Sequence, residues 1–140
     1  MNTDNMSIAG ETIDYGPCAF MEAYNPQTVF SSIDAQGRYA YANQPAIAKW
    51  NLSRLASALL PLIHEDDDQA STLALVTLNE FDARYTEESL AVWRVKLGLG
   101  IADASAQDNQ ADLQLALDFL QLLQDQSIDL LRAGDVWSMF

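Results

Sequence analysis

The sequence predicts a mainly helical protein with a short β-hairpin at its N-terminus. Three observations lead to this fold class. Apolar residues recur at helical spacing from residue 46 onward, two short apolar runs flank a glycine near the N-terminus, and an irregular polar and aromatic stretch lies between these regions. The chain has 140 residues, 49% of them hydrophobic, and is therefore long enough to bury the core of one domain.

The first segment, residues 1–17, is expected to contain the hairpin. Met6–Ala9 and Glu11–Ile13 have the character of two short strands. The turn between them would lie at Ala9-Gly10, because glycine adopts the backbone angles that tight turns require. Paired strands bring their Cα atoms to about 5 Å from each other, so the residues flanking the hairpin should also meet.

The residues that flank this hairpin carry oxygen ligands. Asn5 and Asp14 would bring a side-chain amide oxygen and a carboxylate together, and Mg²⁺ is often held by only one or two such groups. Asp4 would point elsewhere and could accept a proton from a hydroxyl nucleophile. The same residue types also form turns and caps by bonding their own backbone, so the pattern leaves both interpretations open.

The second segment, residues 18–45, is expected to be largely irregular. Cys18–Tyr24 has the character of a helical turn that ends at Asn25-Pro26. Gln27–Pro45 reads as a long loop, and its side chains either touch a substrate or attach the loop to the core, with attachment favoured. The residues that bear this choice are Arg38, Tyr39 and Tyr41.

The third segment, residues 46–140, is expected to be helical. A first helix starts after Pro45 and is ended or kinked by Pro61, with an apolar face that includes Ile47, Trp50, Leu52, Leu55 and Leu59. The acidic run after it, His64 to Asp68, either binds a metal or favours the N-terminus of the next helix, and the helix role is preferred.

Two further helices are predicted. One runs from Gln69 to Leu97, with an optional break at Thr86–Glu88, and ends at Gly98 and Gly100. Its apolar side is expected to comprise Leu73, Val76, Phe81, Tyr85 and Trp93.

The other runs from Asp108 to Gln126 and is apolar on two sides, which predicts a cover on each side or self-association through the uncovered one. One stripe comprises Leu113, Ala116, Leu117, Leu120 and Leu123, and the other Leu115, Phe119 and Leu122. The tail Ile128–Phe140 has no assigned role.

Composition excludes several classes of function. The net charge of −13 and the pI near 4.1 argue against nucleic acid or an anionic membrane as a partner, because both require a basic surface. No apolar run approaches the length of a membrane span, and the first residues lack the basic and apolar regions of a signal peptide. The single Cys18 forms no internal disulfide, and these features together predict a cytoplasmic protein.

Several strings resemble those of the selenoprotein O (YdiU) family, which comprises protein-kinase-like proteins that look like pseudokinases but transfer AMP to protein hydroxyls. These strings are MNTDNMSIAGETIDYGP at the N-terminus, DAQGRYAYANQP at 34–45 and WNLSRLASAL at 50–59. The resemblance covers the first sixty residues closely and the following helices loosely. It implies that the chain is part of the lower lobe of a kinase-like fold, with residues 18–45 in the place of the activation loop.

The resemblance also implies roles for individual residues. Asp4 matches the catalytic base, Asn5 matches a metal ligand, and Asp14 matches the second metal ligand and nucleotide-binding residue, the counterpart of the Asp in the kinase D-F-G motif. The implied cofactor is Mg²⁺ or Mn²⁺, the implied substrates are ATP and protein hydroxyls, and ATP would lie reversed relative to its position in kinases.

The family's glycine-rich loop and its phosphate-binding lysine and arginines have no counterpart here, and the chain has only two lysines, Lys49 and Lys96. Electrostatic stabilisation of the transition state by such cations usually makes the largest contribution to catalysis, so we expect the chain to be inactive alone. We expect it to be a fragment that derives from a truncated reading frame or begins at an internal methionine. The alternative is a non-catalytic acidic helical module that self-associates or pairs with another chain.

Overall fold

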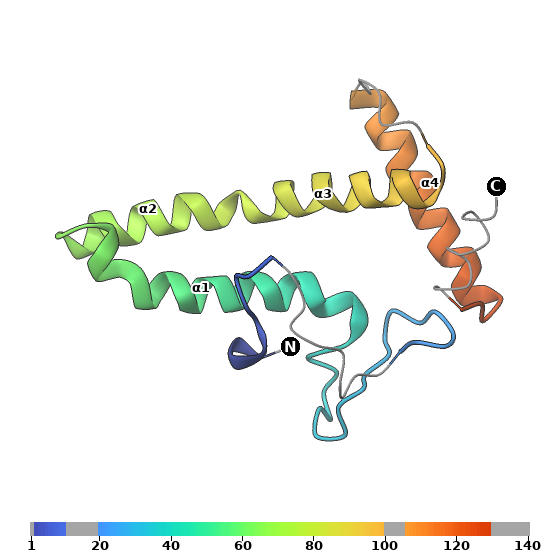
Figure 1. The fold of residues 1–140 in the computed structure, drawn as a ribbon, viewed down its shortest axis with the longest axis horizontal. Coiled ribbons are helices and arrows are strands. Elements are labelled where there is room, and N and C mark those ends of the chain that lie inside the picture. The colour runs from blue at the N-terminus through green and yellow to red at the C-terminus, as the bar shows by residue number, and fades with distance from the viewer. Residues whose placement is uncertain (1, 11–19, 100–105, 130–140) are drawn as a thin grey trace. The chain divides into compact units, whose positions relative to one another are not determined.

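In the computed structural model, which describes residues 2–10, 20–99 and 106–129, the chain folds as helices joined by irregular segments (Figure 1). It divides into two compact units. The first comprises Met1–Ala19 with Gln27–Arg84, and the second comprises Phe20–Pro26 with Tyr85–Phe140. Among the described residues no helix is long and apolar enough to cross a membrane. The predicted helical class is therefore confirmed.

The predicted N-terminal hairpin is not supported. Thr3–Asn5 forms a 3₁₀-helix, η1, and the described part of the expected first strand, Met6–Ala9, contains no strand. The expected second strand, Glu11–Ile13, lies outside the described residues. A two-stranded hairpin is marginal in water without an apolar face to bury, and Ile8, the large apolar side chain of the first strand, is 79% exposed.

Helix α1, Gln44–Ile63, begins where the sequence predicts it. It follows a short 3₁₀-helix, η2 (Tyr41–Asn43), and Pro45 lies in its first turn, where the missing N–H costs no hydrogen bond. The sequence predicts that Pro61 ends or kinks this helix. It does not end it, because the helix continues to Ile63 and the N–H of His64 still donates to the carbonyl of Leu60; the kink stays a prediction.

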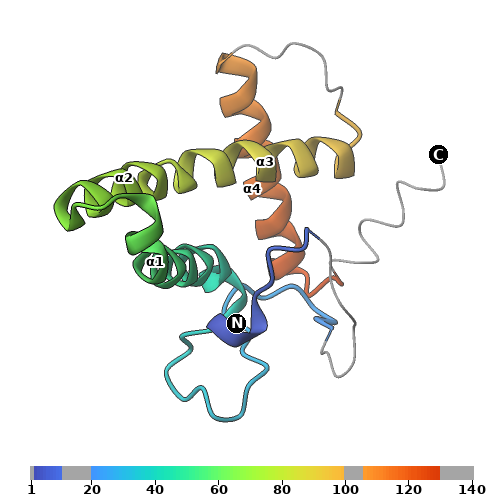
Figure 2. The same ribbon diagram turned by 60° about the vertical axis from the view of Figure 1, so that its left-hand side comes forward.

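Helix α2, Asp67–Asn79, runs beside α1 in both ribbon views (Figures 1 and 2). Ala70 is completely buried, and Ala74 and Leu78 on the same side are half-buried, whereas Leu73 and Val76 are 51% and 58% exposed. The apolar side predicted for this segment was therefore partly misplaced. Small side chains at spacing i, i+4 let the two helices approach, and the larger ones flank this line.

The long helix predicted from Gln69 to Leu97 is two helices. Helix α3, Phe81–Lys96, starts directly after α2, and the break lies at Glu80 and not at Thr86–Glu88. The N–H of Glu80 donates to the carbonyl of Thr77, three residues earlier, so the last turn of α2 tightens toward 3₁₀ geometry and stops. Thr86–Glu88 instead lies inside α3.

The end of α3 follows the prediction. Gly98 has φ of +69°, its N–H donates to the carbonyl of Val95, and the N–H of Leu99 donates to Arg94. These two bonds form a Schellman motif, which requires the left-handed conformation that glycine adopts without strain. Gly100 lies outside the described residues.

Helix α4, Ala106–Asp125, packs with α3 inside the second unit. Arg94 donates to Asp112 at 2.7 Å and to Asn109 at 2.7 Å, and Trp93 meets Phe119 edge to face with 6.4 Å between the ring centroids. Of the two predicted apolar stripes, the first is buried only in part: Ala116 and Leu123 are buried, whereas Leu117 is 51% exposed. In the second stripe, Leu115 and Leu122 are about half-exposed. The self-association predicted from the uncovered side stays a prediction.

The irregular character of residues 27–40 is confirmed, whereas the helical turn predicted at Cys18–Tyr24 is not seen in its described part, 20–24. Tyr24 is instead buried, and its N–H donates to the carbonyl of Ile128 after α4. The backbone N–H of Tyr24 is thus satisfied by a distant carbonyl and not by a helical hydrogen bond.

Candidate functional site

The two adjacent polar residues predicted to do chemistry lie on η1. The N–H of Asn5 donates to the carbonyl of Asn2 at 3.0 Å, and the N–H of Met6 donates to the carbonyl of Thr3 at 3.4 Å, so one tight turn carries both Asp4 and Asn5. A 3₁₀-helix has about three residues per turn, which separates neighbouring side chains by about 120°. The two side chains therefore project in different directions, as separate roles require.

Asp4 and Asn5 are both exposed, and Asp4 also lies in the first turn of the helix. Asp14, the third predicted site residue, lies outside the described residues, so its convergence with Asn5 stays a prediction. Among the residues that the structure describes, no group of three or more His, Cys, Asp or Glu side chains is placed to hold a metal ion.

A hollow of about 320 Å³ lies between the N-terminal segment and α1. From the N-terminal segment it is lined by Thr3, Met6 and Ile8, and from α1 by Asn51, Leu52, Arg54 and Leu55. Its lining residues are apolar apart from Thr3, Asn51 and Arg54. A site with this shape places a few polar groups on an otherwise apolar surface directly beside the turn that carries Asp4.

Asn51 is the polar residue buried within the described part of the chain, with 4% exposure. Its Nδ2 donates to the Sδ of Met6 at 3.6 Å, and its Oδ1 has no partner among the described residues. A buried carbonyl oxygen without a hydrogen bond costs about 1–3 kcal/mol. Asn51 therefore lowers the stability of the fold at this position, which suggests that its side-chain amide has another role.

Sequence reasoning did not select Asn51, although a signal was present. The residue lies four positions after Ile47 and four before Leu55, which places it in the middle of the apolar stripe of α1. A polar residue on such a stripe is buried by its neighbours, and buried polar groups are usually hydrogen-bonded for a structural or functional reason.

The loop before α1 is attached to that helix by an aromatic residue. The guanidinium of Arg38 lies 4.8 Å from the ring centre of Trp50, and that of Arg54 lies 5.4 Å from the same ring. Two cations over one indole give cation–π attraction on top of packing. For Arg38, attachment of the loop, the alternative favoured from the sequence, is the role that these contacts support.

The same loop is closed by a carboxylate. Asp34 accepts hydrogen bonds from the backbone N–H groups of Arg38 at 2.9 Å and Tyr39 at 2.7 Å. These donors, chiefly that of Tyr39, favour the charged form and hold the pKa of Asp34 below its ordinary value. The N–H of Tyr41 meanwhile donates to the carbonyl of Thr28. The carboxylate of Asp34 and the backbone N–H groups of Arg38, Tyr39 and Tyr41 are thus hydrogen-bonded within this segment.

The acidic run after α1 serves the next helix. The carboxylate of Asp66 caps α2 by accepting from the N–H of Gln69 at 2.9 Å, and Asp67 and Asp68 lie in the first turn. The N–H of Asp66 donates in turn to Nδ1 of His64 at 2.9 Å. The preferred interpretation of this run, that its acids favour the helix N-terminus, is confirmed.

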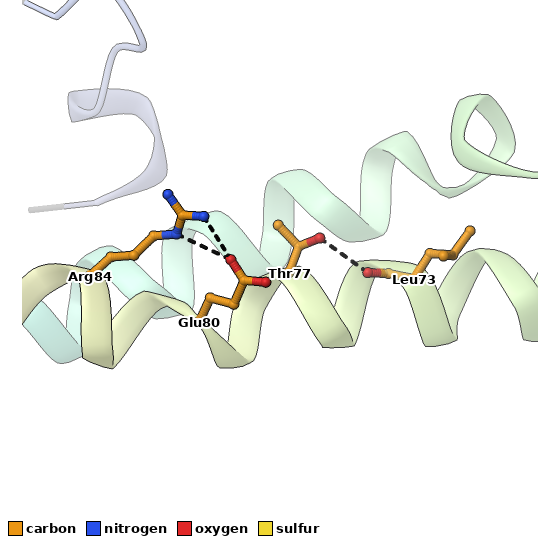
Figure 3. A network of polar contacts seen from close by, with 4 residues as sticks. All are labelled: Leu73, Thr77, Glu80 and Arg84. Carbon is orange, nitrogen blue, oxygen red and sulfur yellow. Dashed lines mark hydrogen bonds and ion pairs between the residues drawn. The ribbon is translucent and has the colours of Figure 1, made fainter.

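A second, apolar hollow of about 430 Å³ lies between α1 and α2 and reaches the first turn of α3. Its lining includes Leu55, Leu59, Leu73, Ala74 and Leu78. Figure 3 shows its polar edge, where Arg84 donates to Glu80 at 2.9 Å and the hydroxyl of Thr77 donates to the carbonyl of Leu73 at 3.2 Å. These groups satisfy one another, so this hollow offers shape and apolar surface but no reactive group.

Comparisons with known proteins agree with the strings noted in the sequence. The model of the family described as protein adenylyltransferase SelO matches residues 1–133. The chain is 58% identical over 113 residues to the protein nucleotidyltransferase YdiU of Bacillus cytotoxicus, which covers 81% of this chain and 23% of that protein. It is 55% identical over 129 residues to the YdiU of Cereibacter sphaeroides, covering 92% of this chain and 26% of the relative.

The chain thus spans about a quarter of the length of the curated relatives it matches. No solved structure matches the chain significantly. The comparisons therefore show the family of the chain and the part of its relatives that it spans, and they supply no second structure of the turn η1.

Proposed function

We propose that this chain, which belongs to the SelO family of protein adenylyltransferases, carries the catalytic-loop part of an enzyme that transfers AMP from ATP to Ser, Thr or Tyr hydroxyls of proteins. The observation that carries the proposal is the pair Asp4 and Asn5 on one exposed turn. A carboxylate that can take a proton and an amide oxygen that can hold a cation are what this chemistry requires at adjacent positions.

Asp4 is proposed as the general base. The substrate hydroxyl oxygen attacks the α-phosphorus of ATP, the bond from that phosphorus to the pyrophosphate oxygen breaks, and the hydroxyl proton passes to the Asp4 carboxylate. Exposure of Asp4 supports this role, since the hydroxyl arrives on another protein and must reach the carboxylate from solvent.

Asn5 and Asp14 are proposed to hold Mg²⁺ or Mn²⁺. The donor set fits such a hard cation, because the amide oxygen of the exposed Asn5 and a carboxylate are both oxygen ligands. When bound, the ion would neutralise phosphate charge and so favour departure of pyrophosphate. Asp14 would also contact the nucleotide through the ion.

The isolated chain is expected to bind nucleotide weakly and to turn over little. Its net charge of −13 repels a polyanionic substrate. Arg54 is the basic side chain among the described residues that line the hollow beside η1, and it already lies over Trp50. The cations that stabilise transferring phosphoryl groups in such enzymes would have to come from beyond the quarter that the chain spans.

Calorimetric titration of the chain with ATP, with and without Mg²⁺ or Mn²⁺, tests the proposal. We expect binding that requires the metal, its loss in Asp14→Ala, and its retention in Asp4→Ala, the matched control that removes a carboxylate proposed not to bind the metal. Circular dichroism should show unchanged helix content in both variants. Equal nucleotide affinity in Asp14→Ala and the parent chain would refute the metal assignment.

A further inference from the structure

The residue that connects α1 to the turn bearing Asp4 and Asn5 is Asn51. It is 4% exposed, lies among apolar neighbours, and donates through Nδ2 to the Sδ of Met6. Met6 follows Asn5 directly and closes η1, because its own N–H donates to the carbonyl of Thr3. A contact that fixes Met6 therefore also fixes the end of the turn that presents Asn5.

Packing alone does not account for an asparagine at this position. A thioether is a weak hydrogen-bond acceptor, so the bond to Met6 satisfies Nδ2 poorly. The other amide atom, Oδ1, has no partner among the described residues. A leucine of similar volume would fill the same space without burying two polar atoms, so the amide is better explained by the segment that it faces.

The described lining of the hollow beside Asn51 does not satisfy Oδ1. This oxygen is buried and accepts no hydrogen bond from the described neighbouring side chains, including those of Thr3 and Arg54 that line the hollow. The bond from Nδ2 to the Sδ of Met6 is therefore the polar contact, among the described residues, through which the Asn51 side chain acts.

We propose that Asn51 is a positioning residue of the site: its side-chain amide holds η1 against α1 by donating through Nδ2 to the Sδ of Met6. The position of Asp4 and Asn5 relative to the helical unit is then set by one buried side chain. The functional consequence rests on the function proposed above, but the contact itself does not.

Amide hydrogen exchange measured by NMR on the full chain, without nucleotide or metal, tests the contact. In Asn51→Leu we expect exchange at Asn5 and Met6 to accelerate roughly tenfold, the loss of about one hydrogen bond, while the amides of α2 change little. Asn51→Gln, which keeps an amide donor for the Sδ of Met6, should restore part of the protection. Unchanged exchange at Asn5 and Met6, or an equal increase throughout the chain, would overturn the proposal.

A variant on the other side of the contact covers the case in which Asn51→Leu does not fold. Met6→Leu removes the sulfur acceptor, keeps the side-chain volume and should accelerate exchange at Asn5. Thr3→Val, which removes a hydroxyl outside the contact, is the matched control and should leave that exchange unchanged. Unchanged exchange in Met6→Leu would refute the anchoring role. Because no ligand is present, failure of metal-dependent ATP binding leaves this result intact.

If the chain binds ATP with Mg²⁺, the same variants separate positioning from packing. Asn51→Leu should weaken the metal-dependent affinity, and Asn51→Gln, which keeps an amide donor, should recover part of it. An affinity that is unchanged in Asn51→Leu, with accelerated exchange at Asn5, would show that the anchor holds the turn but does not place the ligand groups, which contradicts the proposed role in the site.

Discussion

Two exposed segments of the first unit lie beside α1 and are held in different ways. The loop from Asp34 to Gln44 closes on itself: a carboxylate accepts from two backbone N–H groups, and the side-chain amide of Gln44 donates to the carbonyls of Tyr39 and Ala40 at 2.8 and 3.3 Å. The segment of residues 2–10 has the two backbone bonds of η1 and, among the described residues, a side-chain hydrogen bond from the distant Asn51.

The difference shows where each segment obtains its geometry. A loop whose polar groups are satisfied by residues a few positions away is specified locally and keeps its shape whatever surrounds it. A turn that is hydrogen-bonded to a buried amide on a distant helix takes its position from that helix. The candidate catalytic residues lie on the second kind of segment, so their placement is a tertiary property.

The largest expected effect on this comparison comes from protonating or removing the carboxylate of Asp34. Its pKa is lowered in the folded state, chiefly by the N–H of Tyr39, so it stabilises the loop above its unfolded pKa and loses that contribution as pH falls through the lower folded pKa. The amide chemical shifts of Arg38 and Tyr39 should titrate with a midpoint below the ordinary pKa of an aspartate.

Asp34→Ala should reproduce the acid state at neutral pH, with exchange at the amide of Tyr39 roughly tenfold faster. Exchange at Asn5 in η1 should not change, because the two segments are anchored separately. A midpoint at or above the value of a free aspartate, or accelerated exchange at Asn5, would contradict the local account of the loop.

A smaller effect is expected from the stacking of the loop on α1. Arg38→Gln removes a guanidinium that lies over Trp50, and the remaining cation over that ring is Arg54. The free energy of unfolding, from urea denaturation followed by circular dichroism, should fall by about 0.5–1 kcal/mol.

The matched control for this change is Arg84→Gln. Arg84 is an exposed arginine that pairs with Glu80 four residues earlier, and such surface pairs contribute about 0.3–0.5 kcal/mol. If Arg38→Gln costs no more than this control, the stack does not attach the loop and the comparison loses one of its supports.

The smallest effect is expected in the candidate catalytic segment itself. Ile8→Ser removes a large apolar side chain that is 79% exposed, so the free energy of unfolding should change by less than about 0.5 kcal/mol. The same denaturation experiment measures it. A loss larger than that would mean that Ile8 packs in solution and that this segment has a second anchor besides Asn51.

Local sequence signals predicted much of the helical part. Pro45 in the first turn of α1, the Asp66 cap of α2 and Gly98 at the end of α3 each act through bonds within a few residues, so the pattern locates them directly. The break at Glu80 was missed because it depends on a tightened last turn, for which the sequence has no distinct marker.

The predicted hairpin failed for a related reason. An apolar run around a glycine is compatible with two strands, but strands need a surface to cover, and in the described part of this segment Ile8 points into solvent. The roles of Asp4, Asn5 and Asp14 came from resemblance and stay proposals. Asn51 was not predicted because helical periodicity identifies the apolar residues of a buried face and not a polar residue among them.

By itself the amino-acid sequence determined the family, the helical class, the net acidic charge and several of the helix ends, since composition, quoted strings and caps are local properties. Only the tertiary structure decided which apolar side of each helix is buried, that the N-terminal segment forms a turn, and that Asn51 lies beneath it. Those features depend on contacts between residues far apart in the chain, such as the 45 positions between Met6 and Asn51, and periodicity along one helix does not specify them.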